Sequence, residues 1–197
     1  MITYGYSLMA YTTHLTFMTT TEQQYDHVIK SCKEIFLNKA KDYGTAWRVL
    51  RPISIIDQIF IKAQRIRTIQ EKKQQRVADD ILAEFKGIIN YSIIGLIQLE
   101  LPEDPEEDLQ PEQISSLYDV NADAANRIMQ DKNHDYGEAW RSMSQESFVD
   151  LILMKLQRIR QILANDRKSL VSEGVDANYV DIINYAVFAL ILIEENG

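Results

Sequence analysis

The chain has 197 residues, of which 46% are hydrophobic and 25% are charged, the composition of an ordinary globular protein. Its formal net charge of -8 argues against direct binding to DNA or RNA and against anionic membranes, because both are negatively charged. With 7 glycines and 4 prolines the chain lacks the frequent turns of an all-β fold, so we expect helices throughout. The single cysteine excludes a disulfide framework within the chain and fits a reducing cytoplasm.

Residues 1–20 are expected to form a poorly ordered N-terminal tail. Residues 1–17 contain no Lys or Arg, so they lack the charged region that opens a secretory signal. Met18 is a candidate alternative start, and the sequence does not decide whether residues 1–17 belong to the native protein.

A first amphipathic helix is predicted from about residue 21 to Tyr43. Its apolar side chains recur at helical spacing and form one stripe: Tyr25, Val28, Ile29, Cys32, Ile35, Phe36 and Tyr43. Gly44 is expected to end the helix, because glycine readily adopts the left-handed backbone conformation that follows many helices.

A second helix is predicted from about Ser54, a good N-cap residue, to about Lys72. A third is predicted over residues 79–99, and it is apolar almost all round after Phe85, so we expect its neighbours to bury it. Residues 101–110 combine prolines with acidic residues, which stop a helix and keep the segment in water. We predict that they form a linker.

The part of the chain after this linker repeats the part before it. Residues 39–48 return as residues 132–141, and the second helix follows in both copies without a gap. After one inserted residue, residues 88–91 return as residues 182–185. The three predicted helices therefore occur twice.

We divide the chain into repeat 1 (residues 21–100), the linker (101–110) and repeat 2 (111–197). The expected fold is all-α, with two copies of a three-helix unit packed as one pseudo-two-fold helical bundle, because one unit alone could not bury its apolar third helix. The longest apolar run, residues 179–193, contains Asp181 and Asn184 and falls short of the roughly 20 residues of a membrane span. No membrane span is predicted.

Polar residues interrupt the apolar stripes at equivalent places in both repeats. Burying a charged group costs several kcal/mol unless it is paired, so these residues should converge on each other or on a ligand. In repeat 2 the candidate ligand-binding residues are Lys132, Asp135, Tyr136, Trp140, Lys155, Arg158, Asp181 and Asn184. Their equivalents in repeat 1 are Lys39, Asp42, Tyr43, Trp47, Lys62, Arg65 and Asn90.

This pattern has two interpretations. In the first, the lysines and Arg158 bind phosphate oxygens, Asp181 and Asn184 orient a base, sugar or cation, and an aromatic ring offers a stacking surface. In the second, the same residues form a closed ion-pair network, for instance Lys155 with Asp181, which fixes the helices and binds nothing. The first-turn position predicted for Asp57 and Asp150 suits the helix dipole, so we interpret both as structural.

The ordered set of residues 132–137, Lys155 with Arg158, and residues 181–186 resembles the nucleotide modification associated domain 1 family, here in tandem. The resemblance covers both repeats and implies a helical fold and a link to the metabolism of modified nucleotides. The chain departs from the family where Ile61 and Met154 replace a frequent acidic residue, and where Gly87 replaces the acid that Asp181 provides. We therefore expect repeat 1 to be structural and repeat 2 to hold the site.

Two enzyme classes fit the sequence less well. MazG-like pyrophosphatases bind magnesium with carboxylate pairs on successive helices, whereas Asp181 with Asn184 is half a site and Glu103 with Glu106 encloses Pro105. His134-Asp135 is similar to the motif of the His-Asp phosphohydrolases, but those enzymes need several further histidine and aspartate ligands for their metal on neighbouring helices. The cofactor is therefore unknown, with weak support for magnesium, and it is open whether the protein is an enzyme.

The sequence thus predicts a nucleotide-binding or nucleotide-processing protein with a phosphate-binding cluster in repeat 2. The alternative is a non-catalytic helical scaffold or accessory subunit whose buried polar residues are structural. The expected partner is a small phosphorylated ligand, a nucleotide in the first instance, and further homo-oligomerisation is left open.

Overall fold

The computed structural model describes residues 20–73, 80–102, 108–165 and 174–196, and all regular structure in these ranges is helical. Six α-helices and two short 3-10 helices follow one another: α1 (Thr21–Tyr43), η1 (Ala46–Val49), α2 (Pro52–Lys72), α3 (Ile81–Glu100), α4 (Pro111–Tyr136), η2 (Ala139–Ser142), α5 (Gln145–Ala164) and α6 (Val175–Asn196). The predicted all-α class is confirmed. Residues 1–19 of the predicted tail and the middle of the predicted linker (103–107) lie outside the described residues, whereas Thr20, the last residue of that tail, is the N-cap of α1.

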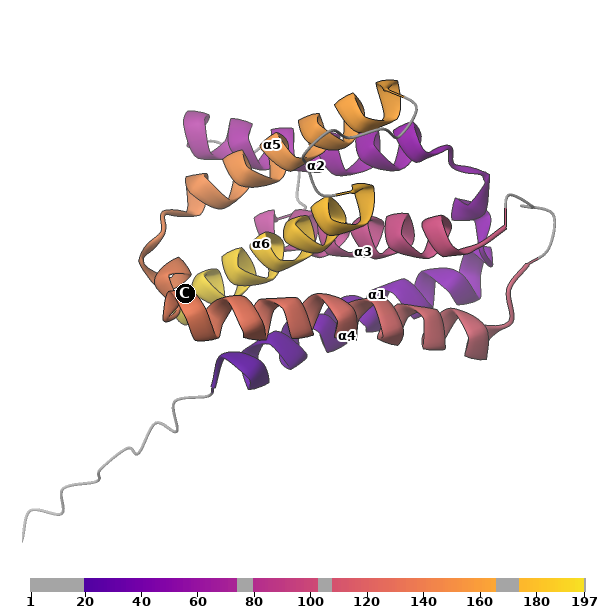
Figure 1. Cartoon of the computed structure of the whole chain (residues 1–197), viewed down its shortest axis with the longest axis horizontal. Coiled ribbons are helices and arrows are strands. Elements are labelled where there is room, and N and C mark those ends of the chain that lie inside the picture. The colour runs from indigo at the N-terminus through magenta and orange to yellow at the C-terminus, as the bar shows by residue number, and fades with distance from the viewer. Residues whose placement is uncertain (1–19, 74–79, 103–107, 166–173, 197) are drawn as a thin grey trace, which may run out of the picture.

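The helices form three layers of two, and each layer takes one helix from each repeat (Figure 1). The middle layer, α3 and α6, packs against α2 and α5 on one side and against α1 and α4 on the other. This arrangement buries the two most apolar helices. By length and composition α3 and α6 could each cross a membrane, but 61% and 78% of their most apolar windows are buried, as expected of core helices.

The helix ends follow from local chemistry. Gly44 ends α1 as predicted, but with φ 58° and ψ -142° it lies outside the left-handed helical conformation that we expected. Gly137, with φ 59° and ψ 40°, ends α4 in that conformation. The predicted start of α2 at Ser54 is wrong. Pro52 is the first residue of α2, because a proline has no N–H to leave unpaired there and its fixed φ suits the first helical turn.

Part of the predicted stripe on α1 is also corrected. Tyr25, Cys32 and Phe36 are buried, whereas Ile35 and Tyr43 are 38% and 72% exposed. Ile35 and Tyr43 border a pocket instead of packing into the core.

The repeats are joined by equivalent contacts, as the subunits of a two-fold dimer are. The Tyr118 hydroxyl of repeat 2 donates to Asn90 Oδ1 of repeat 1 at 2.9 Å, and the Tyr25 hydroxyl of repeat 1 donates to Asn184 Oδ1 of repeat 2 at 2.9 Å. Each asparagine also donates to a backbone carbonyl, Asn90 to Cys32 at 3.0 Å and Asn184 to its equivalent, Ala125, at 3.2 Å.

A second set of equivalent contacts joins α2 to α5. Arg160 lies 2.7 Å from Asp57, and Arg67 lies 3.0 Å from Asp150. Both aspartates thus form ion pairs, but the first-turn position expected for them is wrong. Because α2 and α5 begin before Ser54 and Ser147, the aspartates lie beyond the first turn and pair with arginines of the other repeat.

Candidate functional site

In repeat 2 the predicted polar residues meet at Asp181 of α6. One carboxylate oxygen, Oδ1, lies 2.6 Å from Lys132 Nζ of α4, and the other forms an ion pair with Lys155 of α5. Lys155 and Asp181 are each only 5% exposed, while the Lys132 side chain is 49% exposed. The carboxylate therefore bridges two ammonium groups, and the expected pair between Lys155 and Asp181 is present.

The aromatic surface predicted at Trp140 is covered by protein. Its indole stacks on Phe188 with the ring centroids 4.2 Å apart, and the Arg141 guanidinium lies 4.4 Å from the ring centroid. Trp140 is 6% exposed. We therefore interpret this tryptophan as part of the core.

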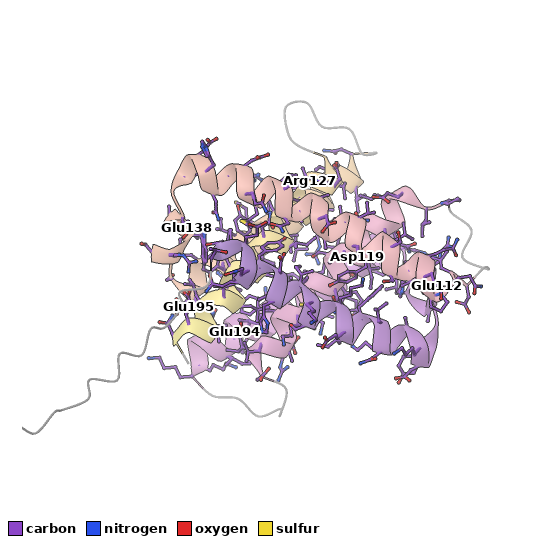
Figure 2. All side chains as sticks on the ribbon, turned by 90° about the horizontal axis from the view of Figure 1, so that it is seen from below. Glu112, Asp119, Arg127, Glu138, Glu194 and Glu195 are labelled. Carbon is purple, nitrogen blue, oxygen red and sulfur yellow. The ribbon has the colours of Figure 1, made fainter. Side chains whose placement is uncertain are left out.

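Arg141 also closes one end of the bundle. It lies 2.7 Å from Glu138 and 2.8 Å from Glu195, and it donates to the Thr21 hydroxyl at 2.8 Å. Figure 2 shows Glu138 and Glu195 near one end of the molecule, away from Glu112. Hydrogen bonds from Thr21 and Arg141 lower the pKa of Glu138, because both stabilise its ionised form.

The other candidates in repeat 2 are placed differently. Asp135, Tyr136 and Arg158 are exposed, and Asp135 lies 3.2 Å from His134. Asn184 uses both ends of its amide in the contacts that join the repeats. The structure thus brings together Lys132, Lys155 and Asp181 of the eight predicted residues.

Repeat 1 has a related ion-pair network with a displaced acid. Lys62 Nζ lies 3.1 Å from Glu84 Oε2, and Arg65 forms an ion pair with the other oxygen of Glu84. Glu84 is 7% exposed and lies one helical turn before Gly87, the position equivalent to Asp181. The sequence prediction did not include Glu84, because it considered only the position equivalent to Asp181, which is Gly87. Its spacing of three residues from Gly87, on the same helix face, is the signal that points to it.

Beside this network lies a pocket of about 460 Å³. Its basic residues come from three helices: Lys39 from α1, Lys62 from α2 and Lys86 from α3. Its other walls are mainly apolar and aromatic and include Ile35, Phe36, Tyr43, Trp47, Tyr91 and Ile94. The predicted residues Lys39, Tyr43, Trp47, Lys62 and Asn90 line this pocket, whereas Asp42 is exposed and Arg65 pairs with Glu84.

Three substitutions between the repeats accompany the deeper burial of Lys155 and Trp140 relative to Lys62 and Trp47. Gly87 corresponds to Asp181, Ile94 corresponds to Phe188, which stacks on the tryptophan, and Lys86 corresponds to Val180. The Lys62 side chain is accordingly 25% exposed, against 6% for Lys155.

The described residues offer little other chemistry. Within the described ranges no group of three or more His, Cys, Asp or Glu could hold a metal ion. Burial raises the pKa of Cys32 to about 12, so its thiol is protonated at neutral pH and is a poor nucleophile. The lysine-lined pocket of repeat 1 is therefore the best candidate site.

Comparison with known proteins agrees with the internal duplication. The family model of nucleotide modification associated domain 1 matches the chain twice, over residues 39–99 and 132–193. No curated protein and no solved structure matches the chain. The two matched segments cover more than half of the chain and include both Asp-Tyr-Gly motifs and most of the helices that carry the two ion-pair networks. The chain belongs to the nucleotide modification associated domain 1 family and carries this domain in two tandem copies.

Proposed function

We propose that the protein binds a nucleotide in the pocket of repeat 1, with the phosphate at its lysines. The observation that carries this proposal is the meeting of Lys39, Lys62 and Lys86, from three different helices, at one pocket. Lys62 pairs with Glu84, whereas Lys39 and Lys86 form no ion pair with a described residue, so the excess positive charge at the pocket favours an anionic ligand.

The size and the walls of the pocket fit a nucleotide. Its volume of about 460 Å³ lies within the range of roughly 300–1,000 Å³ that is usual for small-ligand sites. Lysine ammonium groups bind phosphate as mobile point charges, and the aromatic side chains Tyr43, Trp47 and Tyr91 offer surfaces for a base. The family's association with nucleotide modification supports this ligand class.

The proposal moves the site from repeat 2, which the sequence favours, to repeat 1. In repeat 2 the two lysines share the carboxylate of Asp181, and Lys155 is almost fully buried. A ligand phosphate would have to displace that carboxylate. In repeat 1 a phosphate would displace no carboxylate from Lys39, because Lys39 forms no ion pair with any residue that the structure describes.

A thermal-shift series tests the proposal with deoxy- and ribonucleoside mono-, di- and triphosphates, with and without magnesium. A ligand at 100 times its dissociation constant adds about 2.7 kcal/mol to the free energy of unfolding, which should raise the melting temperature by roughly 5 to 10 °C in a chain of this size.

Lys39→Met should weaken binding about tenfold or more, as expected from losing one charge-assisted hydrogen bond. Lys30→Met is the matched control, because Lys30 is exposed on the same helix and outside the pocket lining. Equal binding by both variants, or a flat panel from folded protein, would overturn the proposal.

A non-catalytic scaffold is the second candidate, and the buried network of repeat 2 favours it. Lys155 and Asp181 fix α5 against α6 without any ligand, and the Tyr–Asn contacts fix the repeats against each other. A flat nucleotide panel would support this function and direct the search to protein partners.

A further inference from the structure

We infer that both repeats contain the same anion-binding position, that Asp181 fills it in repeat 2, and that a phosphate group of the ligand fills it in repeat 1. The inference deepens the proposed function, on which its nucleotide part rests. The anion-binding position itself rests on the comparison of the two repeats.

The contacts of Asp181 define the position. Each of its two oxygens meets one lysine, Lys132 from the first helix of the repeat and Lys155 from the second. A phosphate group can bridge two ammonium groups in the same way, since it also presents several oxygens to separate donors. Asp181 is thus a built-in equivalent of a bound oxyanion.

The equivalent lysines of repeat 1 both line the pocket. Lys39 and Lys62 correspond to Lys132 and Lys155, and Gly87 corresponds to Asp181. Gly87 also lines the pocket, so this part of α3 borders space that a ligand can enter.

The geometry at Gly87 shows how an acid there would act. A Cβ atom added to Gly87 would lie 2.7 Å from Lys62 Cε and 3.1 Å from Lys62 Nζ. The lysine therefore passes directly over the backbone of α3, and an aspartate at this position would bring its carboxylate to the ammonium group after a small shift of a flexible side chain. Glycine leaves room there for the Lys62 side chain, so the ammonium group has no acid at residue 87 to pair with.

The charges of repeat 1 leave room for that anion. Glu84 is shared by Lys62 and Arg65, whereas Lys39 and Lys86 form no ion pair with any residue in the described ranges. In repeat 2 the equivalent of Lys86 is the uncharged Val180. Repeat 1 therefore gathers more uncompensated positive charge around its pocket than the Asp181 site does, which favours a phosphate monoester or free phosphate.

The first test is Gly87→Asp, with Gly87→Asn as its matched control. We expect Gly87→Asp to fold, because repeat 2 accepts aspartate at the equivalent position, and to weaken binding of deoxynucleoside monophosphates and of inorganic phosphate about tenfold or more. The neutral asparagine has nearly the same size and should weaken binding less. Equal loss in both variants would mean that the side chain blocks the pocket sterically, and this result would overturn the inference.

The second test is Asp181→Gly, which removes the built-in anion. We expect this variant to be destabilised and to be rescued by inorganic phosphate, with a larger rise in melting temperature than the wild-type protein shows, while sodium chloride at equal ionic strength does not rescue it. Absence of selective rescue would overturn the inference.

The two proposals fail in different ways. If wild-type protein and Gly87→Asp bind nucleotides equally well, the proposed function is retained and the anion position is rejected. In the opposite case, wild-type protein binds inorganic phosphate, Gly87→Asp does not, and no nucleotide binds more tightly than phosphate. That result would retain the anion position and reject the nucleotide as ligand.

Discussion

At the residue scale, Lys155 shows how the fold tolerates a buried charge. Its side chain is 6% exposed, and its ion pair with Asp181 offsets the cost of removing the ammonium group from water. Lys62 is less dependent on its partner, because it is 25% exposed and Glu84 also pairs with Arg65. The same residue type at equivalent positions should therefore contribute unequally to stability.

We predict that Lys155→Met lowers the free energy of unfolding by about 3 kcal/mol. This is the low end of the usual cost of breaking a buried pair, because Lys132 still contacts Asp181. Lys62→Met is the matched variant and should cost clearly less. Urea unfolding of both proteins measures the difference, and a larger loss for Lys62→Met would contradict the prediction.

A second residue-scale prediction concerns pH. Thr21 and Arg141 hold the pKa of Glu138 below its ordinary value of 4.5, so the ionised carboxylate stabilises the folded protein. That stabilisation is complete above pH 4.5 and is lost as the pH falls through the lower pKa of the folded state. Glu138→Gln should therefore have a lower melting temperature than wild type at neutral pH, and the gap should narrow as the pH falls below 4.5. A gap that stays constant with pH would contradict this account.

At the element scale, the helices meet through tyrosine–asparagine pairs. Burial raises the pKa of Tyr25 and of Tyr118, so both hydroxyls stay protonated and donate to Asn184 and Asn90. Tyr25→Phe and Tyr118→Phe should each cost about 1 to 2 kcal/mol, since each leaves a buried amide oxygen without its donor. Tyr136→Phe, which removes an exposed hydroxyl, is the control and should cost little. Markedly different losses for Tyr25→Phe and Tyr118→Phe in urea unfolding would contradict their equivalence.

A feature of an element can be predicted from the sequence when residues close to it in the chain determine it, and not when its partners are distant in the chain. Helix periodicity and Gly44 are local signals, and they predicted the extent of α1 correctly, although Ile35 and Tyr43 of its predicted stripe are exposed. The roles of Asn90 and Asp57 depend on partners in the other repeat, so no local pattern could distinguish a ligand from Tyr118 or Arg160. The candidate site was predictable only in part for the same reason.

At the scale of the whole molecule, the duplication allows one half of a symmetric fold to change without the other. In repeat 2 an aspartate and a phenylalanine strengthen the packing around Lys155 and Trp140. In repeat 1 a glycine and an isoleucine at the equivalent positions border a pocket. Two identical subunits could not separate these roles, since every substitution would appear in both.

The last prediction concerns the independence of the repeats. Because α3 and α6 bury their apolar surfaces mainly against each other and against α2 and α5, residues 20–102 or 108–196 alone would expose a large apolar face. We expect neither half to be a folded monomer, and the two halves to form a helical one-to-one complex when mixed. Each half also carries both members of the joining contacts, a tyrosine with an asparagine and an arginine with an aspartate, so each could pair with its own copy. Light scattering coupled to gel filtration, with circular dichroism, distinguishes these states. A cooperative, fully helical monomer of either half would mean that the repeats fold independently and that their contacts join two finished domains.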